Sequence, residues 1–325
     1  MADSSNWTFP ENLQPDADSL AYDLDAALDS VVMLRAEIPE DAFTAQTLGT
    51  ERAGNGVVIR EDGLVLTIGY LITEAESVWL GTNSGVVVPG HPLAYDAATG
   101  FGLVLPLGRL GAPMLHRGTS ASVSVDDEVV VIGHGRRMHS LKASIVAKRE
   151  FVGYWEYLLD EALFTAPAHP QWGGTALVGA DGRLIGLGSL LVQEARKEGE
   201  QLQGNMFVPL DLLEPILDEM LRLGRRAAPP RPWLGMYAVE VDGHVAVSDL
   251  ADSGPAARAG VRKGDRVMDV AGAKVRSVAD LFRKLWAAGP AGVEIPLLLG
   301  RRGAAVKVAV RTADRDDLMK KPQLH

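Results

Sequence analysis

Cysteine is absent from the 325-residue sequence, which excludes disulfide bonds, thiolate catalysis and cysteine-based metal sites. Long apolar runs are also absent, because stretches such as 184–192 fall well short of the roughly 20 residues that a membrane-spanning helix needs. Positive charge is in deficit, and a formal net charge of -10 repels polyanions. We therefore expect no membrane span and no nucleic-acid partner.

Residues 1–20 lack the basic start and the apolar stretch that together mark a secretory signal. The missing cysteine fits a reducing and an oxidising compartment equally well. We expect a cytoplasmic protein, or a periplasmic one if a signal has been removed.

From residue 54 onward, short β-branched apolar runs alternate with Gly, Asp or Asn, which is typical of an all-β barrel or sandwich. The strands predicted here are 56–60, 64–67, 77–80, 85–88, 101–105, 128–132, 143–147, 175–179 and 184–192. Residues 24–36 fit either a short helix or a first strand. Residues 211–223 have the apolar spacing of an amphipathic helix, which would end the first domain.

Residues 225–232, R-R-A-A-P-P-R-P, predict a linker. Arg225 and Arg226 could attract a carboxylate or an acidic partner, but we expect them to be exposed charges. The strands predicted beyond it are 233–241, 244–248, 265–270, 293–299 and 304–311, with helices near 255–260 and at 277–288. The predicted organisation is a weakly ordered segment 1–28, a first domain 29–224, the linker 225–232, a second domain 233–312 and a tail 313–325.

Three segments resemble, in order, motifs of the HtrA/Deg family of serine proteases: G-N-G-V-V-I-R-E-D-G-L-V-L-T from residue 54, Y-D-A-A-T-G-F-G-L-V-L from residue 95, and L-F-T-A-P-A-H-P-Q-W-G-G-T-A-L from residue 163. The resemblance implies a trypsin-like double β-barrel. It matches Tyr70 to the general-base histidine, Gly100 to the orienting aspartate and Gly173 to the nucleophilic serine. Gln171 replaces a glycine of the oxyanion turn, and Trp172 adjoins the nucleophile position.

The second domain resembles an HtrA-type PDZ domain through R-P-W-L-G-M from residue 231, S-G-P-A-A-R-A-G-V-R-K-G-D from residue 253 and V-A-D-L from residue 278. The expected fold is thus mainly β: a trypsin-like double β-barrel followed by a PDZ domain, which is a small, partly open α+β barrel. PDZ domains add an extended C-terminal segment to a sheet edge and hold its carboxylate on backbone amides. The resemblance implies the amides of Leu234, Gly235 and Met236, with a pocket wall or merely a core stripe formed by Val278, Leu281, Phe282 and Leu285.

Proteolysis by a triad needs an imidazole base, a carboxylate that orients it and a hydroxyl nucleophile. The phenol of Tyr70, with an ordinary pKa near 10, is a poor base at neutral pH, and Gly100 and Gly173 have no side chain. We therefore expect no catalytic residue, and we expect Tyr70 and Trp172 to fill the former cleft.

A relocated triad would have to use His134 or His169, with Ser189 as the substitute hydroxyl. A lone histidine is more often a hydrogen-bonded structural group than a base, so this arrangement is disfavoured. His134 and His139 have no acidic cluster beside them, and we expect neither a metal nor another cofactor.

The expected function is that of a proteolytically inactive HtrA-like pseudoprotease that binds protein C-termini or extended peptides through its PDZ domain. The resemblance further implies a homo-oligomer, a trimer by analogy with the family. Two alternatives stay open, a serine endopeptidase of protein quality control with a non-standard active site and a holdase-type chaperone.

Overall fold

The structure is a computed structural model that describes residues 7–321. The chain divides into two compact units. The first contains the chain up to Arg149, Glu161–Arg226 and the residues from Lys320 onward; the second contains Glu150–Asp160 and Ala227–Met319. A short segment from the middle of the chain therefore belongs to the C-terminal unit.

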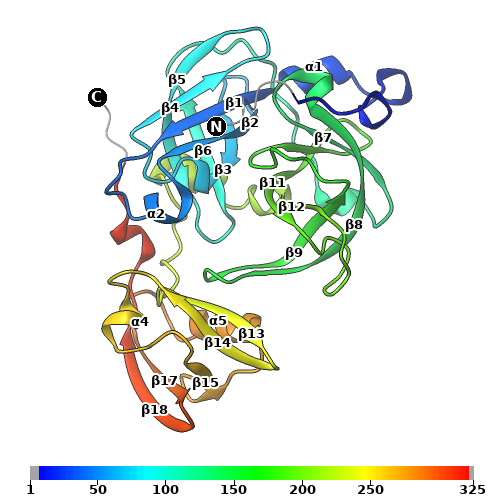
Figure 1. The fold of residues 1–325 in the computed structure, drawn as a ribbon. Coiled ribbons are helices and arrows are strands. Elements are labelled where there is room, and N and C mark those ends of the chain that lie inside the picture. The colour runs from blue at the N-terminus through cyan, green and yellow to red at the C-terminus, as the bar shows by residue number, and fades with distance from the viewer. Residues whose placement is uncertain (1–6, 322–325) are drawn as a thin grey trace. The chain divides into compact units, whose positions relative to one another are not determined.

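The first unit contains two closed antiparallel barrels (Figure 1). The first barrel has the order β1-β2-β3-β6-β5-β4, with β1 Val31–Glu37, β2 Glu51–Val58, β3 Val65–Ile68, β4 Ser77–Gly81, β5 Val87–Tyr95 and β6 Phe101–Pro106. The second has the order β10-β11-β12-β9-β8-β7, with β7 Glu128–Ile132, β8 Ser140–Gly153, β9 Tyr157–Ala166, β10 Ala176–Val178, β11 Leu184–Val192 and β12 Gly204–Pro209. Closure pairs every edge, so neither barrel offers a free strand.

The interior of each barrel is filled by aliphatic and aromatic side chains from the inward faces of its strands. Leu34, Leu66 and Phe101 are fully buried in the first barrel, and Leu141, Leu163 and Phe207 in the second. The double β-barrel expected from the sequence is confirmed. Strands β9 and β12 were missing from the sequence prediction.

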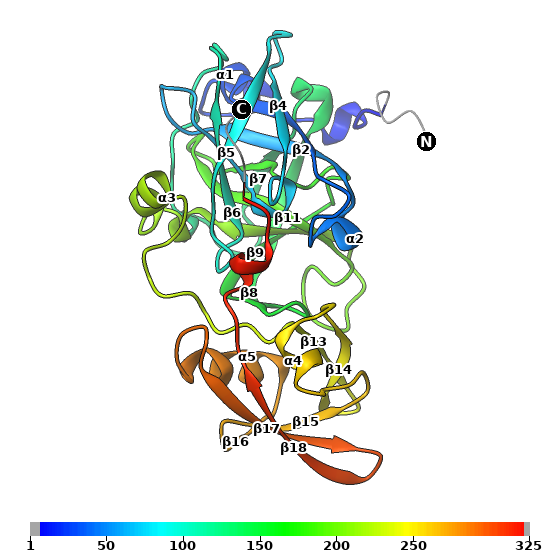
Figure 2. The same cartoon turned by 90° about the vertical axis from the view of Figure 1, so that its left-hand side faces the viewer.

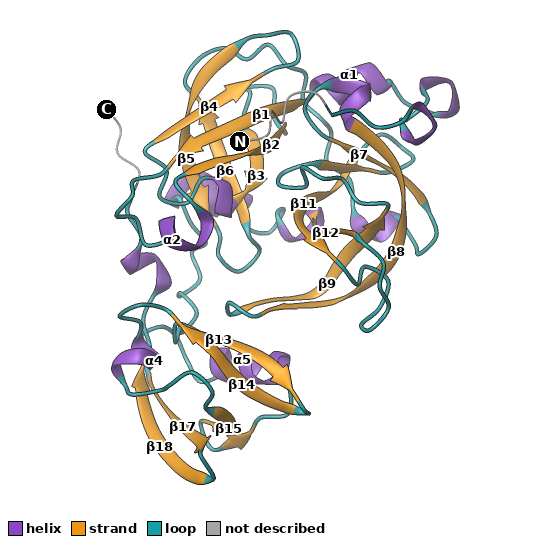
Figure 3. Ribbon diagram, in the orientation of Figure 1, coloured by secondary structure: helices purple, strands orange, loops and turns teal. Residues whose placement is uncertain are grey.

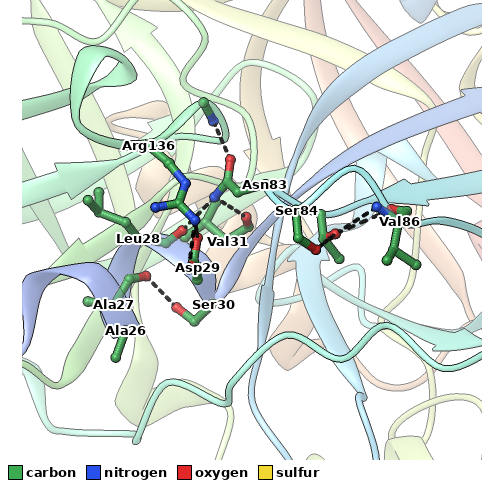
Figure 4. A network of polar contacts seen from close by, with 12 residues as sticks. Ala26, Ala27, Leu28, Asp29, Ser30, Val31, Asn83, Ser84, Val86 and Arg136 are labelled. Carbon is green, nitrogen blue, oxygen red and sulfur yellow. Dashed lines mark hydrogen bonds and ion pairs between the residues drawn. The ribbon is translucent and has the colours of Figure 1, made fainter.

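The undecided residues 24–36 contain both a helix and a strand. Helix α1, Leu24–Asp29, begins at Asp23, whose side chain accepts the Ala26 N–H, and β1 follows directly. At this junction Asn83 donates its amide hydrogens to the carbonyls of Leu28, at 2.9 Å, and Val31, at 3.4 Å (Figure 4). The Asn83 side chain thus joins the end of α1 to the start of β1.

The continuous helix predicted over 211–223 is wrong. A 3₁₀ turn, Leu210–Leu212, is separated from helix α3, Leu217–Leu223, and α3 contacts β5 (Figure 2). Pro215 explains the break, because proline has no N–H to donate and disfavours helical geometry at the residue before it.

The second unit has one sheet in the order β13-β14-β15-β17-β18, with β16 paired to β15 (Figure 3). Its strands are β13 Met236–Val241, β14 His244–Leu250, β15 Arg266–Val270, β16 Ala273–Lys274, β17 Glu294–Arg301 and β18 Ala304–Arg311, and its helices are α4 Pro255–Arg258 and α5 Val278–Ala287. Ser277 caps α5 by accepting the Asp280 N–H, as the sequence predicts.

Candidate functional site

The positions matched to the triad lie close together where the two barrels of the first unit meet. Tyr70 lies in the 3₁₀ turn Gly69–Leu71 that follows β3, and the neighbouring Gly69 N–H donates to the Gly100 carbonyl at 2.7 Å. Gly173 lies in the loop between β9 and β10, and a Cβ atom built on it would stand 2.8 Å from the Tyr70 hydroxyl oxygen. A side chain at 173 would therefore compete with Tyr70 for one space.

The Tyr70 hydroxyl donates a hydrogen bond to the backbone carbonyl of Ser189 at 2.9 Å. Burial raises the pKa of this phenol well above its ordinary value, and the Trp172 side chain partly opposes the rise as a hydrogen-bond donor. Tyr70 is thus a protonated donor at neutral pH with a fixed backbone acceptor, and it offers no basic atom to a hydroxyl.

The loop that carries Gly173 is fastened by Asn55 of β2. Its side-chain amide donates to the carbonyls of Gln171, at 3.0 Å, and Gly173, at 3.1 Å, and its Oδ1 accepts the His134 N–H at 2.8 Å. Asn55 is 2% exposed, and its bond to the Gly173 carbonyl is shielded from water. One side chain of the first barrel therefore fixes two loops of the second.

The turn containing His134 is also held in place by a second asparagine, Asn83. The Gly135 N–H donates to Asn83 Oδ1 at 2.9 Å, which is the third bond of the Asn83 side chain. Gly135 has a φ of +112°, a conformation that glycine adopts without steric cost. Sequence reasoning did not identify Asn55 or Asn83, because an asparagine at either position looks like an ordinary polar residue of a turn.

His169 is a buried structural histidine. Its Nδ1 accepts the Gln171 N–H at 3.1 Å, and its Nε2 lies 2.9 Å from the His139 carbonyl oxygen, so the hydrogen is on Nε2. Burial lowers the pKa of His169 to about 4. Both ring nitrogens are used by the backbone, which leaves no basic atom for a nucleophile.

The same contact removes a donor from the oxyanion turn. An oxyanion hole needs backbone N–H groups that point at the position of the developing charge. The Gln171 N–H, which stands at one of these positions by resemblance, points at the His169 ring instead.

Asp96 is the buried carboxylate nearest in sequence to Gly100, and it is already neutralised. Its Oδ2 accepts the N–H and hydroxyl of Thr99, and the Arg226 guanidinium binds both carboxylate oxygens at 3.2 and 2.9 Å. The expectation that Arg226 is an exposed linker charge is wrong, because its guanidinium pairs with Asp96, the residue that directly follows β5. Asp96 is consequently not free to orient a base.

Within residues 7–321, no group of three or more His, Cys, Asp or Glu side chains is arranged to hold a metal ion. In the same range no helix is both long and apolar enough to cross a bilayer.

In the second unit, the predicted carboxylate-binding loop is occupied by a side chain of the protein itself. The amides of Leu234, Gly235 and Met236 all donate to Glu156 Oε1, at 3.1, 2.8 and 3.1 Å, and the Leu234 amide also reaches Oε2 at 3.1 Å. Glu156 lies between β8 and β9, in the segment that belongs to this unit. Sequence analysis missed it, because nothing in a turn glutamate indicates a partner 78 to 80 residues away.

The helical stripe predicted as a pocket wall lies in the hydrophobic core of the second unit. Val278, Leu281, Phe282 and Leu285 are 7%, 0%, 0% and 0% exposed, and they cluster with Leu158 from β9. With the β8–β9 segment in place, all four side chains are covered.

Comparisons with known proteins agree with this domain order. The family model of a trypsin-like peptidase domain matches residues 54–187, and that of a PDZ domain matches residues 232–312. A probable periplasmic serine endoprotease, DegP-like, from Halomonas elongata is 26% identical over 280 residues, which cover 82% of this chain and 57% of that protein. The serine endoprotease DegS of Haemophilus influenzae is 23% identical over 235 residues, covering 68% of this chain and 65% of DegS.

Solved structures with the same fold include the HtrA-type protease AlgW with a decapeptide, at a TM-score of 0.54 and 19% identity, covering 92% of this chain and 98% of AlgW. The serine endoprotease from Yersinia pestis has a TM-score of 0.53 at 20% identity, covering 92% and 100%. The chain spans little more than half the length of the DegP-like relative.

Two closed barrels that match a trypsin-like peptidase domain, followed by a PDZ domain, define a protein of the trypsin-like protease fold with a C-terminal PDZ domain. The chain belongs to the HtrA/Deg family.

Proposed function

We propose that this protein is a proteolytically inactive member of its family that binds free protein C-termini through its PDZ domain. The observation that carries the proposal is the convergence of three backbone amides, those of Leu234, Gly235 and Met236, on a single carboxylate. A loop that holds a glutamate carboxylate in this way has the donors to hold a C-terminal carboxylate.

The inactivity has three separate physical grounds. Tyr70 is a donor with a raised pKa and cannot act as a base at neutral pH. Gly173 has no nucleophile, and the space beside it holds the Tyr70 hydroxyl. The Gln171 N–H is bonded to His169, so restoring a serine alone would not restore the oxyanion hole.

The conformation of Gly235 supports binding of a carboxylate at the loop. Its φ is +69°, which turns its N–H toward the same carboxylate oxygen as the neighbouring amides. A Cβ atom at this position would stand 2.9 Å from the Trp233 ring. The loop shape therefore depends on glycine.

Peptide binding is tested by fluorescence anisotropy with labelled peptides that end in an apolar residue, each with a free and with an amidated C-terminus. We expect binding of the free acids only. Gly235→Val should abolish it, whereas Gly243→Val serves as the matched control, because Gly243 has nearly the same φ, +71°, but no atom within 4 Å of its Cβ position. Equal binding of free and amidated peptides, or retention of binding by Gly235→Val, would contradict the proposal.

Catalysis is tested on the same preparation with an unfolded protein substrate and an active-site-directed serine reagent. We expect neither cleavage nor labelling, with an active trypsin-fold protease as the positive control. Specific cleavage would favour the alternative of an endopeptidase with a non-standard active site. Suppressed aggregation of a client without a free C-terminus would favour the holdase alternative.

The proposed oligomeric state rests on the family resemblance, and the proposed cellular compartment rests on the sequence. A homo-oligomer, a trimer by analogy with the family, is our proposal and is tested by sedimentation of the purified chain. The cytoplasmic location stays a prediction, and the DegP-like relative is described as periplasmic.

A further inference from the structure

We propose that the turn between β8 and β9 is a resident ligand of the PDZ domain, so that an external C-terminus binds only by displacing Glu156. This inference rests on the proposed function, because it concerns regulation of the same carboxylate-binding loop. The segment involved, Glu150–Asp160, is called the plug below.

The plug reproduces the main-chain contacts of an added strand as well as the carboxylate. The Ala238 N–H of β13 donates to the Tyr154 carbonyl at 3.0 Å, two residues beyond the last amide that binds Glu156. A peptide that extends a PDZ sheet would use the same combination, with a carboxylate on the loop and backbone bonds along the edge. Plug and peptide therefore exclude each other.

The plug also fills apolar space that a ligand side chain would need. Leu158 is 7% exposed and belongs to the same hydrophobic cluster as Leu281, Phe282 and Leu285 of α5, and Val152 packs against this cluster. Removing the plug would expose these side chains to water unless an apolar ligand residue replaced it. The ligand class that fits is thus an extended segment with a free carboxylate and an apolar residue close to its C-terminus.

The contacts that exposed side chains of the plug make are weaker than the contacts of Glu156 and Leu158, and a ligand can replace them more easily. The Arg283 guanidinium of α5 lies 2.5 Å from Glu150 and 2.6 Å from Asp160, and its side chain is 48% exposed. Exposed ion pairs of this kind contribute little to stability. The Tyr154 ring meets the Tyr237 ring edge-on, with the centroids 5.8 Å apart, while Tyr154 itself is exposed.

Backbone strain in the plug favours its release. Glu156 has a φ of +60°, in the left-handed region that residues other than glycine adopt only with strain. An external C-terminus has no such strain and carries the same carboxylate. The plug's advantage is that it belongs to the same chain, which corresponds to an effective concentration on the order of millimolar.

The competition predicts a defined effect of the Glu156 side chain on external binding. The apparent dissociation constant for a peptide is the intrinsic dissociation constant divided by the population of the open state. Removing the internal carboxylate should therefore tighten binding of free-acid peptides by roughly tenfold or more. Glu156→Gln keeps the side-chain size but removes the charge, and Glu156→Ala removes both carboxylate oxygens.

The experiment measures peptide affinity by anisotropy for the full wild-type chain, Glu156→Gln, Glu156→Ala and the matched control Glu161→Gln. Glu161 is a β9 carboxylate that lies 3.6 Å from Lys148 Nζ and does not contact the loop. We expect tighter binding in both Glu156 variants and wild-type affinity in the control. Equal affinity in wild type and both Glu156 variants overturns this inference and leaves the proposed function standing, whereas no binding in any variant overturns the proposed function itself.

A second measurement does not depend on the variants. Hydrogen–deuterium exchange of the wild-type plug is compared without peptide and with saturating peptide, with circular dichroism confirming that each protein is folded. Exchange in residues 153–157 should accelerate as peptide binds, while the Ala238 amide stays protected by its new partner. Unchanged protection of the plug in the peptide complex would refute displacement.

Discussion

The occupied space beside Gly173 can be probed by a double-mutant cycle of Gly173→Ala and Tyr70→Phe. The alanine Cβ would stand 2.8 Å from the Tyr70 hydroxyl oxygen, closer than ordinary contact. In the Phe variant this oxygen is gone, and the next atoms are Leu71 Cδ1 at 3.6 Å and the ring carbon that carried the hydroxyl at 3.7 Å. Gly173 is not one of the described glycines with a positive φ, so an alanine at this position introduces no backbone strain.

The expected magnitudes follow from these contacts. Gly173→Ala alone overpacks a buried site and should cost about 1–3 kcal/mol. Tyr70→Phe alone loses the bond to the Ser189 carbonyl and should cost about 1 kcal/mol. Together they should cost less than the sum by about 1–2 kcal/mol, because the clash is removed along with the hydroxyl.

The assay is urea denaturation of all four proteins. The transition of the first unit is identified by hydrogen exchange, because a protein with two units does not unfold as a single two-state system. Gly186→Ala in β11 is the matched control: Gly186 is buried and has no positive φ, and its Cβ would lie 3.3 Å from the Val208 carbonyl oxygen and not beside Tyr70, so its cost should be the same in both backgrounds. Additive effects of Gly173→Ala and Tyr70→Phe would refute the conclusion that Tyr70 fills the nucleophile position.

Two further perturbations test other parts of the molecule. Asn55→Ala removes the donor of the Gln171 carbonyl, one of the two donors of the Gly173 carbonyl and the acceptor of the His134 N–H, and it should lower the unfolding free energy by about 2–4 kcal/mol in urea denaturation. Hydrogen exchange in 171–175 should be faster, and unchanged stability would contradict the conclusion that Asn55 holds these loops. Burial lowers the pKa of His169 to about 4, so the stability that this residue contributes is complete above its ordinary pKa of 6.5 and is lost as pH falls toward 4. The urea midpoint of His169→Asn should therefore change less with pH over this window than the midpoint of the wild type. Parallel pH curves for the two proteins would refute this reasoning.

The architecture was predictable because it depends on patterns that neighbouring residues carry. Alternating apolar runs gave most of the strands, and Ser277 with Asp280 gave the start of α5 to within one residue. The failures also have local causes. Pro215 interrupts a run whose apolar spacing is otherwise helical, and the pattern of residues 24–36 fits two elements because two are present.

The contacts of the candidate sites were only partly predictable, because they join residues far apart in the chain. The sequence identified Tyr70 and Gly173 as the altered positions but could not show that one occupies the other's space. Asn55 contacts residues 116 and 118 positions away. Glu156 had no recognisable signal, since its role arises from amides that are themselves independent of residue type.

Three positions at which a protease of this fold would receive a substrate or a ligand are filled here by the chain's own groups. Tyr70 takes the space at Gly173, His169 takes the Gln171 N–H, and Glu156 takes the amides of the PDZ loop. The first two contacts are buried and have no competitor of equal chemistry, since a substrate carbonyl would have to replace an aromatic ring or a fully buried imidazole. Glu156 is different, because a C-terminal carboxylate brings the same oxygens without the strained backbone. We therefore expect the barrel site to be closed permanently and the PDZ site to be closed reversibly, which makes the PDZ loop the place where this protein responds to a partner.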